Sequence, residues 1–499
     1  MIRLIYRTNL SSPLVTCFHL ILPLLLLCFL TELFSGCMVG PDFQRPEVEM
    51  PQEWSKSVPW GTENYEELSQ WWTLFEDQTL NWLIDKAVSS NLDIKLAIAR
   101  VSQARAARGK SAADMGPVLN ASASYRRYHG QPDNMPEMQQ PLPSTEYVTD
   151  NQYNTVFDAG WEIDLFGGLR REIESLDAQL EASIEAQRDV LVTLTAEVAR
   201  SYFDLRFLQT REAIAELHLK AQEHSARLAR QRFQSGLVGR IDVTNAEMQA
   251  AETAARIPLL EAAAGQTIHK INILLGGYSD SLTDKLAAME NVPIVIPSVP
   301  VGVPSDLLRR RPDIRQAEAQ IHSATAQIGV VTADLFPKIT ISGSLTYLAN
   351  SLSSLFISDS LLWSIGPTVG LNLFDNGRTR ASIKVQEAVE EQALITYKKK
   401  VLTALVEVKD ALIALEKEEM HCKALYASVQ ANRKSVQLAN QLYLAGETDF
   451  LQVLVVEQSL YTKEDALAQS RGKKITNMIS LYKALGGGWN HSHPAIPKG

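Results

Sequence analysis

The sequence predicts a mainly helical protein that also contributes transmembrane β-strands to a barrel shared between several chains. Three observations support this fold class. Four segments alternate apolar and polar side chains, two long runs carry heptad repeats without a proline, and the 499-residue chain repeats itself internally. A composition that is 45% hydrophobic is ordinary and excludes wholesale disorder.

The four alternating segments have the pattern of strands with one apolar face. Between 153 and 165, aromatic and aliphatic residues alternate with polar ones such as Asn154, Asp158 and Glu162. Alternation over about ten residues with aromatics near the ends is typical of transmembrane strands, whereas strands of soluble sheets usually have about five to six residues. The expected strands cover about 118–128, 153–165, 338–348 and 361–373.

Four strands are too few to close a membrane barrel. The smallest outer-membrane barrels have about eight strands, and an open sheet edge is not tolerated in lipid. Several copies must therefore pool their strands, and the periodicity does not choose between two copies and three. If the polar face lines the interior, the lipid-facing side chains are Phe157, Trp161, Ile341, Leu345 and Trp363. A register error of one residue would reverse this assignment.

Long helices follow the second strand of each pair. Apolar residues recur every seven positions from Val401 through Val408 and Leu415 to Tyr443, and no proline lies between 374 and 446 or between 168 and 237. Heptads sustained this far indicate a coiled coil. Each run of about 70 residues would span on the order of 100 Å. Cys422 lies in this seam and is interpreted as a core residue.

The internal repeat sets the expected organisation of the chain. A shift of 220 residues places Asp93 on Asp313, Gly109 on Gly329 and Pro117 on Pro337, and a shift of 210 places Gly236 on Gly446. The resulting segments are a signal peptide (1–36), an anchor and equatorial segment (37–90), a first repeat (91–280), a proline-rich connector (281–310), a second repeat (311–488) and a tail (489–499).

The first residues resemble a bacterial lipoprotein signal. Arg3 and Arg7 precede a short apolar run, and Ser35 and Gly36 precede Cys37, whose thiol would take a covalent lipid after cleavage. The apolar run is too short for a transmembrane helix. Met38 stands where an aspartate would retain such a lipoprotein at the inner membrane, so export to the outer membrane is expected. The alternative is an ordinary secretory leader with a chance cysteine.

Charge and motifs exclude several function classes. A net charge of −9 argues against a nucleic-acid partner. The sequence has no GxSxG, HExxH or CxxC motif, and we expect no catalytic residue, no metal site and no cofactor beyond the lipid on Cys37. The histidines of "NHSHP" near the end are interpreted as part of a polar tail.

Several stretches together resemble a known family. They are "GCMVGPDF" (36–43), "LLRRRPDIRQAEAQI" (307–321), "ADLFPKI" (333–339) and "LFDNGR" (373–378). The chain resembles the TolC-type outer membrane factors, in the lipoprotein branch with OprM and CusC, also called the NodT family. The resemblance implies a homotrimer with a twelve-stranded outer-membrane barrel and a periplasmic α-helical barrel. It also implies docking to a periplasmic adaptor and an inner-membrane pump, which we expect to be of the resistance-nodulation-division type.

The resemblance places the gate at two helix–turn–helix tips, 236–242 and 446–452. Where TolC relatives carry an acidic ring, this sequence has Gln452 and Val455, so such a ring is not expected. The expected tip residues are Gly236, Leu237, Arg240, Asp242, Gly446, Glu447, Asp449, Phe450 and Leu451. For Leu237, Phe450 and Leu451 the options are an apolar constriction, adaptor contact or tip packing, and for the charged residues the alternative is a solvated turn.

The function expected from these features is that of the exit duct of a tripartite efflux or secretion system in the outer membrane. A type I protein-secretion duct is an alternative within the same class. An autonomous porin would need at least eight strands in its own chain, and a structural surface coiled coil would not need paired amphipathic strands. The sequence does not identify the exported substrate.

Overall fold

The computed structural model describes residues 38–52, 54, 68–130, 148–278, 280–288 and 302–489. The expected signal peptide, Cys37 and the tail from residue 490 lie outside these residues. The chain divides into two compact units. One comprises Met1–Arg45, Ala104–Leu180 and Ala319–Leu394, and the other comprises Pro46–Gln103, Glu181–Glu318 and Ile395–Gly499.

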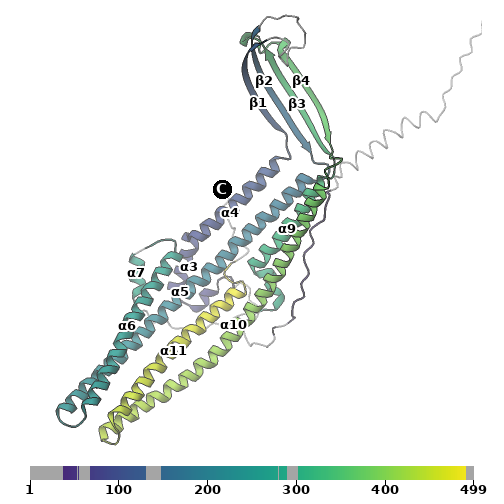
Figure 1. Ribbon diagram of the computed structural model, residues 1–499. Coiled ribbons are helices and arrows are strands. Elements are labelled where there is room, and N and C mark those ends of the chain that lie inside the picture. Colours follow the sequence, from purple (N-terminus) through teal and green to yellow (C-terminus); the bar gives the residue numbers. More distant parts are fainter. Residues whose placement is uncertain are drawn as a thin grey trace, which may run out of the picture. The chain divides into compact units, whose positions relative to one another are not determined.

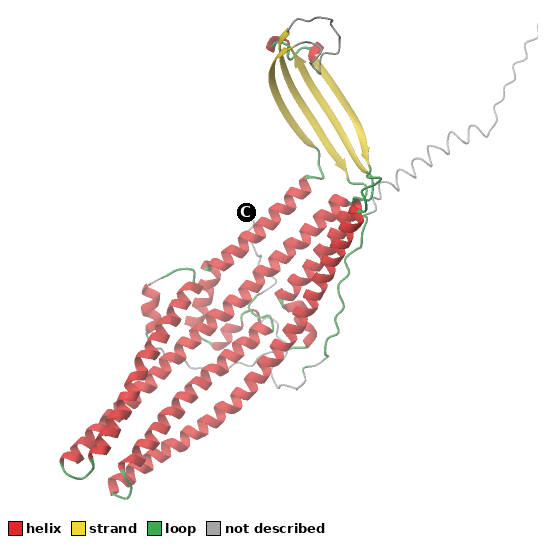
Figure 2. Ribbon diagram, in the orientation of Figure 1, coloured by secondary structure: helices red, strands yellow, loops and turns green. Residues whose placement is uncertain are grey.

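The first unit contains a four-stranded antiparallel sheet, which confirms the expected four strands per chain (Figure 2). Its order is β1-β2-β3-β4, so β2 and β3 are neighbours although they belong to different repeats. The edges of the sheet are β1 and β4. Pro367 lies in β4, where an edge strand tolerates a residue without an N–H. The strands are β1 (Val118–Gly130), β2 (Val148–Ile163), β3 (Lys338–Ala349) and β4 (Leu361–Gly370).

Two of the strands end earlier than the alternation predicts, because the backbone turns into a helix. Asp164 accepts hydrogen bonds from the N–H groups of Leu169 and Arg170, at 3.3 and 3.0 Å. Gly167 has a φ of +79°, which a glycine adopts without strain. At the second joint Asn376 and Gly377 take the corresponding positive φ values, +56° and +82°. Glycine and asparagine at these joints therefore permit the abrupt change of direction.

The helices include two of unusual length. α5 has 67 residues and α10 has 68, and each is followed by a shorter antiparallel partner (Figure 1). Among the described residues, no helix carries an apolar stretch suited to crossing a bilayer. The helices are α3 (Gln78–Ser90), α4 (Leu92–Ala113), α5 (Gly168–Gln234), α6 (Arg240–Leu274), α7 (Asp280–Ala287), α8 (Leu307–Arg310), α9 (Pro312–Ala333), α10 (Arg378–Ala445) and α11 (Phe450–Ala484).

The proline-rich connector expected over 281–310 includes two short helices in its described residues. α7 lies at its start, with Leu282 and Leu286 buried, and α8 at its end. α7 ends before the first of the prolines that exclude a helix, Pro293, and α8 begins after the last of them, Pro304. Residues 289–301 lie outside the described residues.

The core of the second unit includes an aromatic cluster. Trp71 is fully buried and stacks on Tyr482 with 5.0 Å between the ring centroids. Tyr202 donates a hydrogen bond to Asp77 at 2.7 Å. Gly487 fits beside Trp71 because a Cβ at this position would lie 2.9 Å from the carbonyl oxygen of Leu68. These contacts join the C-terminal end of α11 to the segment before α3.

The internal repeat is visible as a pair of equivalent junctions. A Cβ on Gly276 would lie 2.3 Å from the Ser90 carbonyl oxygen, and one on Gly486 would lie 3.0 Å from that of Arg310. Beside these glycines, the side chain of Asn91 donates to the Leu274 carbonyl at 2.8 Å, and Arg311 donates to that of Ala484 at 3.0 Å. The two halves therefore close their hairpins onto the preceding helix by the same close approach.

Candidate functional site

The first tip is the turn between α5 and α6. Gly236 has a φ of +74°, and the Leu237 N–H donates to the Arg232 carbonyl at 2.9 Å, which ends α5 with a left-handed glycine. Asp242 accepts a hydrogen bond from the Gly239 N–H at 3.2 Å and so secures the first turn of α6. Gly236 and Asp242 thus build the turn itself.

The second tip, between α10 and α11, has the same design. Gly446 has a φ of +76°, and the Glu447 N–H donates to the Leu442 carbonyl at 2.9 Å. Asp449 is the N-cap of α11 and accepts a hydrogen bond from the Gln452 N–H at 3.2 Å. Figure 1 shows the two tips side by side at the same end of the second unit.

The two tips share one apolar core. Phe450 is 3% exposed and packs against Tyr443, with 5.1 Å between the ring centroids. The Arg232 guanidinium lies over the other tip's Tyr443 ring, 4.4 Å from its centroid. In the single chain Phe450 therefore packs inside the tip, which is one of the three options expected for it. The core consists of Ala226, Ala229, Val243, Ala246, Ala439, Tyr443, Phe450, Val453 and Leu454.

The outer surface of the tips carries both apolar and charged side chains. Leu237 is 71% exposed and Leu451 is 51% exposed. The side chains of Arg240 and Glu447 are exposed and form no ion pair with any residue that the structure describes. Of the four expected charges, Asp242 and Asp449 cap helices, while Arg240 and Glu447 are left to solvent or to another chain.

A line of polar contacts joins α5 to α11 above the tips. The Arg211 guanidinium pairs with Asp465, with 2.6 Å between Nε and Oδ1. Seven residues further, His218 Nε2 lies 2.7 Å from Glu464 Oε2. The hydrogen bond from His218 lowers the pKa of Glu464. This line connects the hairpin of the first repeat to that of the second.

Glu457 continues this line towards the tips. One of its oxygens lies 3.5 Å from the Ser225 hydroxyl, and Oε2 is buried without a hydrogen-bond partner among the described residues. Burial raises the pKa of Glu457. These contacts were not predicted from the sequence, although Arg211, His218 and Ser225 recur at heptad spacing along α5 and could have indicated them.

The strand register decides which side chains share a face of the sheet. Phe157 is opposite Leu345, Trp161 is opposite Ile341, and Leu345 is opposite Trp363. All five expected lipid-facing residues therefore lie on one face, and all are exposed in the single chain. Trp161 also donates a hydrogen bond from Nε1 to the Met115 carbonyl at 2.8 Å.

The opposite face of the sheet is polar. A row of residues in register runs across all four strands, from Asn120 through Asp158 and Ser344 to Ser364. Asn120 donates to Asp158 at 3.0 Å, and the two serine hydroxyls lie 2.9 Å apart. The two faces thus have the contrast that separates lipid from water in a barrel wall.

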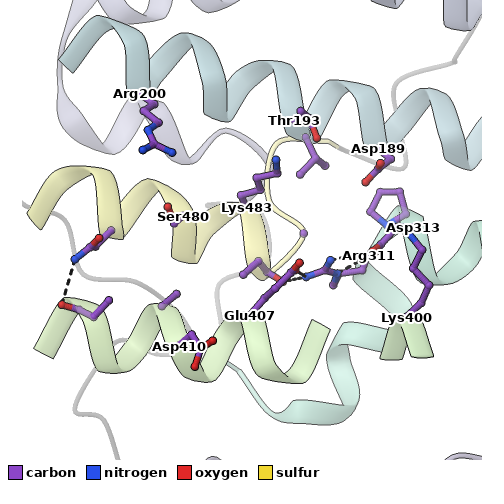
Figure 3. Close-up of a pocket in the computed structure, with 17 residues that line it drawn as sticks. Asp189, Thr193, Arg200, Arg311, Asp313, Lys400, Glu407, Asp410, Ser480 and Lys483 are labelled. Atoms are coloured by element: carbon purple, nitrogen blue, oxygen red, sulfur yellow. Dashed lines mark hydrogen bonds and ion pairs between the residues drawn. The ribbon is translucent and has the colours of Figure 1, made fainter. Parts of the chain in front are cut away.

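A charged cleft of about 630 Å³ lies in the second unit, between α5, α10 and α11 (Figure 3). Arg311 is 8% exposed and pairs with Asp313 at 2.9 Å and Glu407 at 2.6 Å. Burial raises the pKa of Asp189 in the same cleft, and the nearby Asp313 raises it further. Four cationic and four anionic side chains line the cleft, so it favours neither sign: Arg200, Arg311, Lys400, Lys483, Asp189, Asp313, Glu407 and Asp410.

Metal-binding side chains do not gather in the described part of the chain, where no three histidine, cysteine, aspartate or glutamate side chains lie together as ligands would.

Cys422 is a free, half-buried thiol on α10. Arg309 to Arg311 lead into α9, which begins at Pro312, as expected for proline in a first helical turn.

Comparison with known proteins agrees with this architecture. The profile of the outer membrane efflux protein family matches residues 83–277 and 303–487. Nodulation protein T of Rhizobium leguminosarum bv. trifolii is 31% identical over 462 residues, covering 93% of this chain and 97% of that protein. The probable outer membrane lipoprotein SilC of Salmonella typhimurium is 29% identical, with 92% and 97% covered.

The solved structure of the outer-membrane channel OprN has a TM-score of 0.83 and 37% identity, covering 91% of this chain and all of that one. The resemblance inferred from the sequence is confirmed. With a family profile that spans both repeats, and with four membrane strands joined to two long helical hairpins, the chain belongs to the outer membrane efflux protein family and is the outer-membrane channel of an efflux system.

Proposed function

We propose that three copies of this chain pool their four-stranded sheets into one twelve-stranded barrel, the assembly that the family resemblance implies. The edges β1 and β4 have no partner on their outer sides within the sheet, and lipid does not tolerate unpaired backbone. The observation that carries the proposal is the register, which gathers Phe157, Trp161, Ile341, Leu345 and Trp363 on one face. That face contacts lipid, and the polar face lines water.

Nitroxide labels at two neighbouring residues test which face contacts lipid. A label at Leu345 in the membrane-inserted protein should be relaxed by oxygen, which concentrates in lipid. A label at Ser344, on the other face, should instead be relaxed by a water-soluble nickel complex. If the two labels respond alike, or in the reverse order, the proposed orientation of the sheet is wrong.

The helical tips form the gate of this duct. Their shared apolar core holds the two hairpins of one chain together, and the exposed charges Arg240 and Glu447 are available to neighbouring copies. The exposed Leu237 and Leu451 are available to the adaptor. Opening requires the hairpins to separate, which would expose part of the tip core unless a partner covers it.

The duct acts together with a periplasmic adaptor and an inner-membrane pump of the resistance-nodulation-division type. A photo-crosslinking residue at Leu451 should capture the adaptor in cells that express it, whereas the same residue at the buried Val453 should not. Equal crosslinking at both positions would contradict a specific tip contact. The chain performs no covalent chemistry, because a passage controls access and does not transform its substrate.

The lipid anchor is attached to Cys37. Radioactive palmitate should label the wild-type protein and fail to label Cys37→Ser, while both remain trimeric. If labelling persists after the substitution, the lipid is attached to another residue. If the mature N-terminus maps to a residue other than Cys37, the proposed lipid anchor is wrong.

A further inference from the structure

The segment that follows Cys37 is bound into the first unit as an extended chain. We call Met38–Phe43 the docked segment. Its Val39 N–H donates to the Phe166 carbonyl at 3.1 Å, at the joint between β2 and α5. Terminal segments are usually poorly ordered unless such bonds tie them down. The residues "VGPDF" (39–43) are therefore part of an ordered, hydrogen-bonded segment, and the efflux function alone does not explain why this segment is ordered.

Arg171, in the first turn of α5, holds the docked segment from one side. Its side chain is only 2% exposed, and a buried guanidinium must find acceptors for its donors. Nε donates to the Val39 carbonyl at 3.1 Å, and Nη2 donates to Asp42 at 2.6 Å and to the Gly40 carbonyl at 3.4 Å. Nη1 pairs with Glu174 at 2.8 Å. Three of these four acceptors belong to the docked segment.

Glycines make the room for this contact. Gly40 has a φ of +89°, and a Cβ there would lie 2.4 Å from the Cα of Gly329 on α9. A Cβ on Gly329 would in turn lie 2.9 Å from the Val39 carbonyl oxygen. A Cβ on Gly167 would lie 2.9 Å from the Cα of Met38. Backbones from three distant parts of the chain therefore meet where no side chain fits.

The C-terminal end of the docked segment is held by stacking between two aromatic rings. Phe43 stacks on His322 of α9, with 4.5 Å between the centroids and 16° between the planes. His322 Nε2 lies 3.0 Å from Glu174, which also pairs with Arg171. The segment therefore bridges α5 of the first repeat and α9 of the second.

We propose that Gly167, Arg171, His322 and Gly329 form a docking site for the chain's own mature N-terminus. The site holds Met38, the residue that follows the anchor residue Cys37, at the strand-to-helix joint. A lipid held in this way is not on a flexible tether, so it sets the depth of the joint in the membrane. The part of this inference that concerns the lipid rests on the proposed acylation of Cys37, whereas the docking does not.

The internal repeat supplies a matched control. Gly109 on α4 is the counterpart of Gly329, and nothing lies within 4 Å of a Cβ built on it. Glycine to alanine favours a helix equally at both positions. Gly329→Ala should therefore expel the docked segment, and Gly109→Ala should leave it in place.

The test uses a nitroxide on Gln44→Cys, an exposed position next to Phe43, in a Cys422→Ser background. The label should be immobile in the membrane-inserted protein and in Gly109→Ala. In Gly329→Ala it should move about tenfold faster, as expected of an untethered segment. A mobile label in the unsubstituted protein, or an immobile one in Gly329→Ala, would overturn the docking site.

A second pair of variants applies if Gly329→Ala does not fold. Arg171→Gln removes the contacts to the docked segment, whereas Arg170→Gln removes contacts to Asp164, which lies outside that segment. Only Arg171→Gln should free the label, and equal mobility in both would contradict the assignment. If the label is immobile but no variant incorporates palmitate, the docking stands and the lipid anchor fails. If palmitate is incorporated but the label is mobile in every variant, the lipid anchor stands and the docking site fails.

Discussion

The tip core gives the sharpest test of how the duct is held closed. Phe450→Ala removes a ring that is 3% exposed and packed against Tyr443. Truncating a buried phenylalanine typically weakens packing by about 3–5 kcal/mol. The neighbouring Leu451 is 51% exposed, so Leu451→Ala removes little buried surface and serves as the control.

Because the tips lie at the end of long helices, the loss should appear as local opening and not as global unfolding. A loss of about 3 kcal/mol corresponds to a roughly hundredfold increase in the population of the open tip. Hydrogen exchange measured by mass spectrometry on the purified trimer should therefore speed up by this factor at the start of α11. Exchange unchanged from wild type, or faster in Leu451→Ala than in Phe450→Ala, would refute the role of the tip core.

Three further predictions concern charges. Asp242→Arg removes a carboxylate that caps Gly239 at the start of α6, a position worth about 1 kcal/mol, so leak conductance in planar bilayers should rise roughly fivefold; an unchanged leak argues against gating by this tip. Arg311→Met leaves Asp313 and Glu407 without their cation and should destabilise the fold by about 3–5 kcal/mol; a melting temperature within about two degrees of wild type would contradict this. Burial raises the pKa of Glu457, so its ionisation weakens folding as pH rises through the raised value; Glu457→Gln should stabilise the protein at neutral pH and lose this advantage towards about pH 4. The control Glu464→Gln should do the opposite, destabilising at neutral pH and converging with wild type in acid, because the His218 hydrogen bond lowers the pKa of Glu464; stability profiles that run parallel for both variants would refute the assignment.

Local patterns in the sequence determined the elements. Alternation with period two specified four strands, and heptads without proline specified two helices of 67 and 68 residues. Glycine and asparagine marked the joints and the tips. These features depend on neighbours within a few residues, through side-chain direction and backbone freedom, so they can be read from the chain itself.

Contacts between distant residues were decided only by the tertiary structure. The pairing of β2 with β3, the burial of Phe450 and the polar line from α5 to α11 each join residues from different repeats. The docked segment required Gly40, Arg171 and Gly329 to meet, and no spacing in the sequence reveals that a glycine is needed for a close approach from elsewhere. Periodicity states which face of an element is apolar, but the identity of the neighbour on that face follows from the packing of the whole chain.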